Sequence, residues 1–210
     1  MRTLTLSITT ALLLSLSPVY VSAGDAPADS TSIGSSVGSS IGSSVGNADT
    51  SVSDKIINYQ RRSPAIATGG SLSVGAMSAL KQQGFKTVVD LRTPKEGIEK
   101  EQFRAAANDI EYVNLPVARA FPDAAMREQF KQLVENPANH PMLLHCGSAN
   151  RVGMVWAAYQ LDQGVSFDAA AAEGRAIGMK PGKEKQLVEY YQSKLKAPKA
   201  PQAPTVIIGE

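Results

Sequence analysis

A single thiol, followed five positions later by an arginine, is the group of residues in this sequence with the clearest chemistry. Cys146 is the only cysteine among the 210 residues, and Arg151 closes the short turn after it. Residues 141–145 are apolar until the last one, as expected of a buried strand, and a helical pattern begins at Asn150 or Arg151. We therefore expect the thiol to lie at a strand-to-helix turn.

This position suits both a nucleophile and an anion site. The positive end of a helix and its unpaired N–H groups stabilise a thiolate, and the same N–H groups can hold a tetrahedral oxyanion. Arg151 adds a planar, permanently charged guanidinium that matches such an anion. The alternative is that Cys146 only fills space in the core. We predict Cys146 and Arg151 as catalytic. The predicted substrate-binding loop consists of Gly147, Ser148, Ala149, Asn150 and Arg151.

The segment from His145 to Arg151 resembles the active-site loop His-Cys-x5-Arg of cysteine-dependent tyrosine and dual-specificity phosphatases. More closely, it resembles the loop His-Cys-x-Ser-Gly/Ala-x-Arg of a bacterial phosphatase-like family that is also found fused to beta-lactamase-like hydrolases. The similarity extends over most of residues 54–180. The segments that carry it are Thr68-Gly69-Gly70-Ser71, Gly84-Phe85, Val88-Val89-Asp90-Leu91-Arg92, Arg151-Val152-Gly153 and Ala172-Glu173-Gly174-Arg175-Ala176-Ile177-Gly178.

The resemblance implies a two-step phosphoryl transfer from a phosphorylated substrate whose type the sequence does not identify. Cys146 would attack phosphorus, and the loop N–H groups with Arg151 would hold the equatorial oxygens. His145 would support the loop and orient the thiolate rather than act as the base. The resemblance therefore implies a phosphoric monoester hydrolase of the protein phosphatase kind.

Two departures from the phosphatase pattern keep alternatives open. Only four residues separate Cys146 from Arg151, which resembles the six-residue loop of rhodaneses and allows a sulfurtransferase with a persulfide on Cys146. Val152 stands where many phosphatases have a serine or threonine that helps to discharge the phosphocysteine. A catalytically weak module that binds phosphate or another oxyanion is the third possibility.

The expected mechanism also needs a general acid that protonates the leaving oxygen. In related phosphatases an aspartate precedes the cysteine by about thirty residues, but residues 114–119 contain no carboxylate. Asp123 is the nearest candidate, and it could equally cap the helix that follows it. At a predicted strand end, Arg92 could contact the substrate and Asp90 could anchor the loop, or the two could form a structural salt bridge; Arg119 has the same two possibilities.

Alternating strand and helix patterns predict an α/β fold with a single domain, whose central, mostly parallel sheet is flanked by helices. Ligands bind such sheets beyond the carboxyl ends of the strands. The predicted strands cover residues 65–68, 86–91, 111–117 and 141–145. The predicted helices cover residues 73–83 (with Ser73 as N-cap), 96–108, 123–135, 150–164, 166–177 and 183–194.

The ends of the chain differ in composition from this domain. Residues 1–23 have a basic start, an apolar stretch and small residues before a cleavage point, which predicts a signal peptide and a periplasmic or secreted protein. Residues 24–53 are rich in Gly and Ser and read as a disordered linker. We assign residues 54–196 to the phosphatase-like domain and residues 197–210 to a Pro/Ala-rich tail.

The charge and the metal-binding residue types limit the function classes. The net charge of +2 gives no reason to expect nucleic acid as a partner, and no stable membrane insertion is expected after signal cleavage. Two histidines and one cysteine offer no convincing metal set, and His140 is expected in a surface loop. We expect no metal and no cofactor; the sequence does not indicate an oligomeric state.

Overall fold

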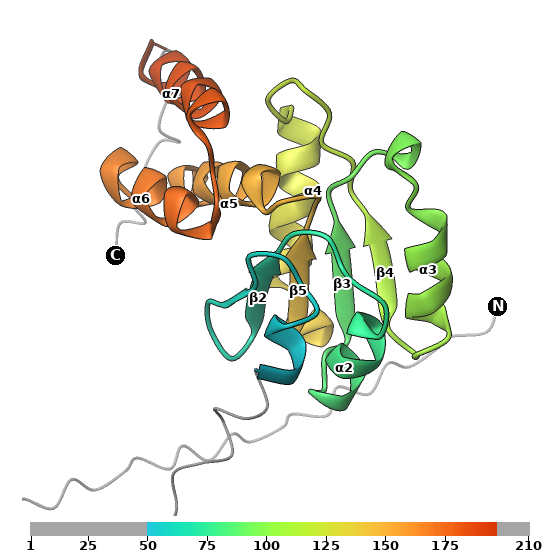
Figure 1. The fold of residues 1–210 in the computed structure, drawn as a ribbon. Helices are drawn as coiled ribbons and strands as arrows, with labels where there is room; N and C mark the ends of the chain where they lie inside the picture. Colours follow the sequence, from blue (N-terminus) through green and yellow to red (C-terminus); the bar gives the residue numbers. More distant parts are fainter. Residues whose placement is uncertain (1–49, 197–210) are drawn as a thin grey trace, which may run out of the picture. The chain divides into compact units, whose positions relative to one another are not determined.

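A five-stranded sheet lies at the centre of the structure, a computed structural model that describes residues 50–196 (Figure 1). The expected signal peptide, residues 24–49 of the expected linker and the expected tail lie outside the described residues. The strand order is β1-β2-β5-β3-β4, with β2, β5, β3 and β4 parallel and β1 antiparallel at one edge. The strands are β1 (Gln60–Arg61), β2 (Ile66–Gly69), β3 (Thr87–Asp90), β4 (Glu111–Asn114) and β5 (Met142–His145). The expected α/β class with a mostly parallel sheet is confirmed.

Strand β5 is the central strand of the sheet and carries apolar side chains to both faces. Leu143 packs into a core cluster with Ala67 and Val88, whereas Leu144 packs into a second cluster with Val89. Successive side chains of a strand point to opposite faces, so an uninterrupted apolar run fits a strand that is covered on both sides. The run before Cys146 therefore reflects burial on two faces.

The helices cover the two faces of the sheet unequally (Figure 1). The side chains of α2 and α3 join the cluster on one face, and those of α4, α5, α6 and α7 join the cluster on the other. The helices are α2 (Ala76–Gln82), α3 (Glu99–Ala106), α4 (Ala124–Glu135), α5 (Asn150–Asp162), α6 (Phe167–Ile177) and α7 (Pro181–Lys196); two 3₁₀ turns are η1 (Pro94–Glu96) and η2 (Pro137–Asn139). No helix of the described residues is long and apolar enough to cross a membrane.

Several expected boundaries differ from the structure. Helix α2 begins at Ala76, with Gly75 as its N-cap at a left-handed φ of 83°, so the expected cap Ser73 lies outside it. The expected helix over 96–108 is divided, because Gly97 at φ 77° separates η1 from α3. Residues 50–53 are helical and the side chain of Val52 is fully buried, so folded structure begins inside the expected linker.

Candidate active site

The loop after β5 leaves the carboxyl edge of the sheet between β2 and β3. The N–H of Cys146 donates to the last carbonyl of β2 at 3.3 Å. The N–H and the hydroxyl of Ser71 both donate to the carbonyl of Gly147, at 3.1 and 2.9 Å. The amide of Asn58 donates to the carbonyl of Ser148 at 3.2 Å. Residues outside the loop thus bind its carbonyls and hold them away from the helix that follows.

The N–H groups of this loop, by contrast, are only weakly engaged. Within residues 50–196, the N–H of Gly147, Ser148 or Ala149 makes no backbone hydrogen bond of ordinary geometry, although an antiparallel bridge pairs Ser148 with Gly70. Ala149 is fully buried and has a left-handed φ of 63°, which is uncommon for a residue with a Cβ atom. Because buried N–H groups are normally paired, consecutive weakly engaged ones before a helix have the geometry of an anion site.

Arg151 lies in the first turn of α5 and is held by a carboxylate from the other side of the cavity. Its Nη1 and Nη2 donate to the two carboxylate oxygens of Glu96 at 2.7 and 2.6 Å. Nη1 also approaches the carbonyl of Val117 at 3.1 Å. The pKa of Arg151 lies above its ordinary value, mainly through the hydrogen bonds to Glu96, and the charge of Cys146 adds to this. A side-chain hydrogen bond to Cys146 also raises this pKa, so the guanidinium lies close to the thiol.

Glu96 is itself fixed by the turn that carries it. Residues Thr93 and Glu96 form a capping box, in which the N–H and hydroxyl of Thr93 donate to Glu96 Oε2 at 2.8 and 3.0 Å. The hydrogen bonds from Arg151 lower the pKa of Glu96 to about 2, and those from Thr93 also contribute. Glu96 is therefore ionised at neutral pH.

A cavity of about 820 Å³ opens in front of the loop. Loop residues Ser148, Asn150 and Arg151 line one part of it, and Cys146 is 1% exposed and does not line it. The remaining lining residues come from the segment after β3, the segment after β4 and the region around the start of α7: Thr93, Glu96, Ala118, Arg119, Lys180, Gly182, Lys183 and Gln186.

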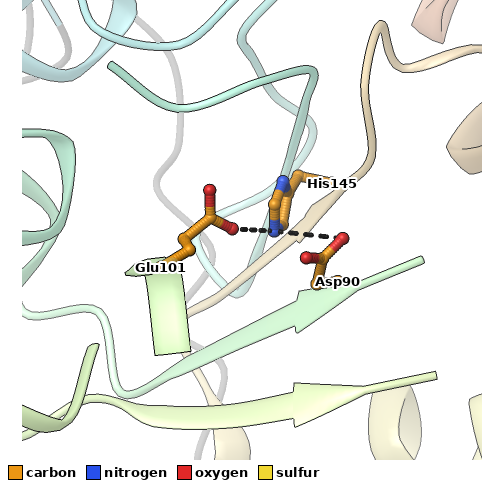
Figure 2. Close-up of side chains that lie close together, drawn as sticks. All are labelled: Asp90, Glu101 and His145. Atoms are coloured by element: carbon orange, nitrogen blue, oxygen red, sulfur yellow. Dashed lines mark ion pairs between the residues drawn. The ribbon is translucent and has the colours of Figure 1, made fainter. Parts of the chain in front are cut away.

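His145 lies behind the loop between two carboxylates (Figure 2). Its Nε2 is 2.9 Å from Glu101 Oε1 and 3.6 Å from Asp90 Oδ1, although neither ring nitrogen makes a well-directed hydrogen bond to a described residue. Arg92 bridges the same two carboxylates at 2.7 Å each, and Tyr112 donates its hydroxyl to Asp90 at 2.5 Å. Burial raises the pKa of Asp90, but the hydrogen bonds from Arg92 and the other partners outweigh it and lower the pKa overall.

This network tests two expectations about Asp90, Arg92 and His145. Asp90 and Arg92 form a structural ion pair, and neither lines the cavity. His145 also lies outside the cavity, which fits a supporting position for the residue before Cys146. One atom each of Asp90, Glu101 and His145 lie within 4.8 Å of one another, as metal ligands would. Arg92 already supplies the positive charge between the two carboxylates, so the donor set does not fit a metal ion.

Asp123, the candidate general acid, is the N-cap of α4. Its Oδ1 accepts a hydrogen bond from the N–H of Met126 at 2.8 Å, and the residue does not line the cavity. Asp123 is therefore placed as the helix cap that was expected as the alternative to a general acid. Arg119 does line the cavity, whereas His140 does not: its Nε2 donates to the carbonyl of Val134 at 2.8 Å.

The sequence analysis did not single out Glu96, Glu101, Lys180 or Lys183. For Glu96 a signal was present, since Thr93-Pro94-Lys95-Glu96 has the spacing of a capping box directly after a strand. No comparable local signal marks the lysines. They reach the cavity because the N–H of Lys180 donates to Asn150 Oδ1 at 2.8 Å, which joins the start of α7 to the loop.

With this geometry described, comparison with known proteins identifies the family. Residues 43–190 match the sequence model of a family described as DSP-PTPase phosphatase fused to NAD+ kinase. This chain belongs to that family. The expected membership of the tyrosine and dual-specificity phosphatase superfamily is confirmed, and the chain is a cysteine-dependent phosphatase-type hydrolase. The fusion partner in the family's description is NAD+ kinase, whereas the sequence resemblance pointed to a family with beta-lactamase-like partners.

Individual relatives of this DSP-PTPase domain agree with that assignment. A rice (Oryza sativa subsp. japonica) protein named probable NAD kinase 2, chloroplastic, is 33% identical over 104 residues, which are 46% of this chain and 10% of the rice protein. The chain therefore matches only a small part of that protein's length, and the kinase activity in its name is not transferred.

Solved structures show the same fold. The core catalytic domain of the PP-IP phosphatase SIW14 from S. cerevisiae, in complex with citrate, is 17% identical with a TM-score of 0.56. That match covers 68% of this chain and 90% of the yeast chain. TpbA of P. aeruginosa in complex with pTyr is 22% identical with a TM-score of 0.53, covering 65% of this chain and 83% of the other.

Proposed function

We propose that this DSP-PTPase domain is an exported hydrolase of phosphate monoesters that works through a phosphocysteine intermediate on Cys146. The observation that carries the proposal is the row of N–H groups at Gly147, Ser148 and Ala149, which make no backbone hydrogen bond of ordinary geometry among residues 50–196 and which precede the guanidinium of Arg151. These donors suit a tetrahedral dianion beside the only thiol of the chain.

In the proposed first step, the thiolate of Cys146 attacks phosphorus and the bond from phosphorus to the leaving oxygen breaks. The loop N–H groups and the guanidinium of Arg151 hold the equatorial oxygens while the charge on them redistributes. In the second step, water attacks the phosphocysteine, the sulfur–phosphorus bond breaks and the thiolate is restored. Val152 follows Arg151 and its side chain is fully buried in the core, so it does not help to discharge the intermediate.

The proposal is tested with the purified, reduced protein and p-nitrophenyl phosphate. We expect turnover that vanadate inhibits and that the Cys146→Ser variant loses, with a phosphoryl mass increment on Cys146 after rapid acid quench. Ser148→Ala is the control variant and should keep its turnover. The hydroxyl of Ser148 makes no hydrogen bond to a described residue, and the proposal needs only the backbone N–H of this residue. No turnover by a folded protein with a reduced thiol would contradict the proposal.

A catalytically weak oxyanion-binding module is the second candidate function. It is favoured by the burial of Cys146, which is 1% exposed, and by the position of Asp123 as a helix cap rather than in the cavity. In that case vanadate or phosphate would bind equally well to Cys146→Ser by calorimetry, without turnover of any phosphate ester. A rhodanese-like reaction would be detected separately, as sulfur transfer to cyanide with a persulfide increment on Cys146.

Export is proposed from the sequence of residues 1–23, which lie outside the described residues. The expected result is a mature protein in the periplasm or medium whose amino terminus begins close to Gly24. Edman sequencing or intact mass measurement of the fractionated protein checks this, and an unprocessed protein in the cytoplasmic fraction would contradict it.

A further inference from the structure

The cavity in front of the loop carries more positive charge than a single phosphoryl group requires. Arg119, Lys180 and Lys183 line it together with Arg151, and among residues 50–196 only Arg151 of these four is paired with a carboxylate. The side chains of Arg119 and Lys180 make no hydrogen bond or ion pair with another residue of the described part of the chain. Unpaired cations around a phosphate loop favour a substrate that brings further negative charge.

Lys183 is the cation most closely fixed to the cavity. Its Nζ donates to the carbonyl of Arg119 at 2.9 Å and to Gln186 Oε1 at 3.0 Å, which leaves one of its three N–H donors free. The pKa of Lys183 lies below its ordinary value because burial disfavours the ammonium; repulsion from Arg151 adds to this, and the charge of Cys146 opposes it. The ammonium therefore lies within electrostatic reach of both reacting-loop residues.

Among the described residues, the same cavity offers no carboxylic acid that could protonate a leaving oxygen, the role an aspartate has in an ordinary phosphatase. Of the cavity-lining residues among 50–196, Glu96 is the only one with a carboxyl group, and its bidentate bond to Arg151 keeps it ionised. Asp123 is engaged as a helix cap. A leaving group must then depart as an anion, stabilised by cations instead of by a proton.

Leaving groups differ greatly in how readily they depart as anions without receiving a proton. An alkoxide is the anion of an acid about as weak as water, and a tyrosine phenolate is the anion of an acid with a pKa of about 10. A phosphate leaves as the anion of an acid with a pKa of about 6 and keeps further charge for the cations to bind. Without an acid in the cavity, phosphate is the leaving group that fits best.

We propose that the preferred substrate is a phosphoanhydride, in which the transferred terminal phosphoryl group is attached to a second phosphate that Lys180, Lys183 and Arg119 bind. This inference rests on the proposed phosphatase function and specifies its substrate class. The Cys146 thiolate forms a bond to the terminal phosphorus, and the bond from that phosphorus to the bridging oxygen breaks. The bridging oxygen leaves with its electron pair on the second phosphate and needs no proton. Water then attacks the phosphocysteine and the sulfur–phosphorus bond breaks; the thiolate is restored and both hydrogens of the water stay on the released phosphate.

The test compares substrates that differ in leaving group on the full reduced protein. The panel consists of inorganic tripolyphosphate, a nucleoside diphosphate, p-nitrophenyl phosphate, phosphotyrosine and glycerol 2-phosphate. We expect kcat/KM to be highest for the two anhydrides and at least about a hundredfold lower for glycerol 2-phosphate than for tripolyphosphate. Comparison of tripolyphosphate with the nucleoside diphosphate shows whether the site prefers a bare polyphosphate or a polyphosphate that carries an organic group.

Lysine variants then test the bound second phosphate. Lys180→Gln and Lys183→Gln are each expected to reduce kcat/KM for tripolyphosphate by about tenfold, and to reduce that for p-nitrophenyl phosphate by a smaller factor. Lys180→Gln is the safer variant because the Lys180 side chain makes no hydrogen bond or ion pair with another described residue, and its backbone bond to Asn150 is unaffected. Lys185→Gln is the matched control, because Lys185 is exposed on α7 and lies outside the cavity. It should act like the wild type on both tripolyphosphate and p-nitrophenyl phosphate.

Several outcomes would overturn the inference. Equal kcat/KM for glycerol 2-phosphate and tripolyphosphate would show that the site protonates its leaving group. Equal losses on tripolyphosphate and p-nitrophenyl phosphate in the lysine variants would show that these residues do not bind a second phosphate. Cys146-dependent turnover of p-nitrophenyl phosphate without any preference for anhydrides overturns only this inference, whereas no turnover of the whole panel overturns the proposed function as well.

Discussion

Glu96 and Arg151 are the two side chains whose contact shapes the candidate site at the scale of single residues. Their bidentate pair is partly exposed, at 17% for the Arg151 side chain and 38% for that of Glu96. Exposed ion pairs contribute only about 0–1 kcal/mol to stability, so the pair matters more for where the guanidinium lies than for holding the fold. Glu96 is in this sense a positioning residue.

The Glu96→Gln variant should therefore lose activity without losing stability. We expect kcat/KM for p-nitrophenyl phosphate to fall about 10- to 100-fold, since a guanidinium that is misplaced by about 1 Å no longer matches the transition state. The denaturation midpoint should change little. Steady-state kinetics and urea titration of the same sample check the two expectations.

Glu99→Gln provides the control for Glu96→Gln, because Glu99 is exposed on α3 and makes no contact with the cavity. It should match the wild type in both measurements. The positioning role would be wrong if Glu96→Gln kept full activity, or if its activity fell only in proportion to the fraction unfolded.

At the scale of elements, the close crossing of α5 and α6 determines where the loop can sit. A Cβ atom on Gly153 would lie 2.4 Å from the carbonyl oxygen of Gly174 and 2.8 Å from the backbone nitrogen of Met179. Both atoms belong to backbone that cannot move aside as a flexible side chain would. Helix α5 begins directly after Ala149, so its distance from α6 also sets the position of the loop N–H groups.

The Gly153→Ala variant tests this crossing. We expect it to lower the free energy of unfolding by about 1–3 kcal/mol, the usual cost of forcing an extra methyl group into a packed interior. Urea-induced unfolding followed by tryptophan fluorescence measures the change, since Trp156 lies on the same helix.

Gly182→Ala is the comparison for Gly153→Ala, because a Cβ atom at Gly182, in the first turn of α7, meets nothing within 4 Å. It should leave the free energy of unfolding unchanged or raise it slightly, as alanine favours helix. If the two alanine variants were equally stable, the close crossing would not constrain α5.

At the scale of the whole molecule, several carboxylates are more acidic in the fold than in an unfolded chain. Burial raises the pKa of Asp162, but hydrogen bonds from Lys194, Tyr190 and Arg127 outweigh it and lower the pKa overall. The pKa values of Asp90, Glu96 and Glu173 are also lowered. A group whose pKa is lower in the folded state stabilises that state above its ordinary pKa and loses this contribution as the pH falls.

Stability should therefore be constant near neutral pH and fall as the pH drops below the ordinary carboxylate values of 3.8 and 4.5 towards about 2. The urea midpoint measured at several pH values between 7 and 2 checks the trend. Asp162→Asn should be less stable at neutral pH, and its urea midpoint should fall less steeply as the pH drops, because the variant lacks one of the carboxylates whose pKa is lowered by folding.

Asp109→Asn is the reference for that experiment, since Asp109 is 91% exposed and its 3.9 Å pair with Lys81 is of the weak surface type. Its pH dependence should overlay that of the wild type. A stability that stays constant down to pH 2 would contradict the assignment of these carboxylates as stabilising groups.

What the amino-acid sequence determined by itself was mostly local. The apolar run before Cys146, the turn after it and the helix that starts at Asn150 follow from the preferences of neighbouring residues, and the structure has each of them. The α/β class follows from the same alternation of strand and helix patterns. Short or glycine-interrupted elements were predicted less well. Strand β1 has only two residues, and Gly97 divides the stretch over residues 96–108 that the pattern predicted as one helix.

Only the tertiary structure decided which distant residues meet at the loop. Glu96 bonds to Arg151 across 55 positions of sequence, and Lys183 reaches the carbonyl of Arg119 across 64. The sheet order places β5 between β2 and β3, so the segments after β3 and β4 and the start of α7 converge on one cavity. A pattern of neighbouring residues reports local backbone preference, whereas such meetings depend on how whole elements pack, which short-range spacing does not encode.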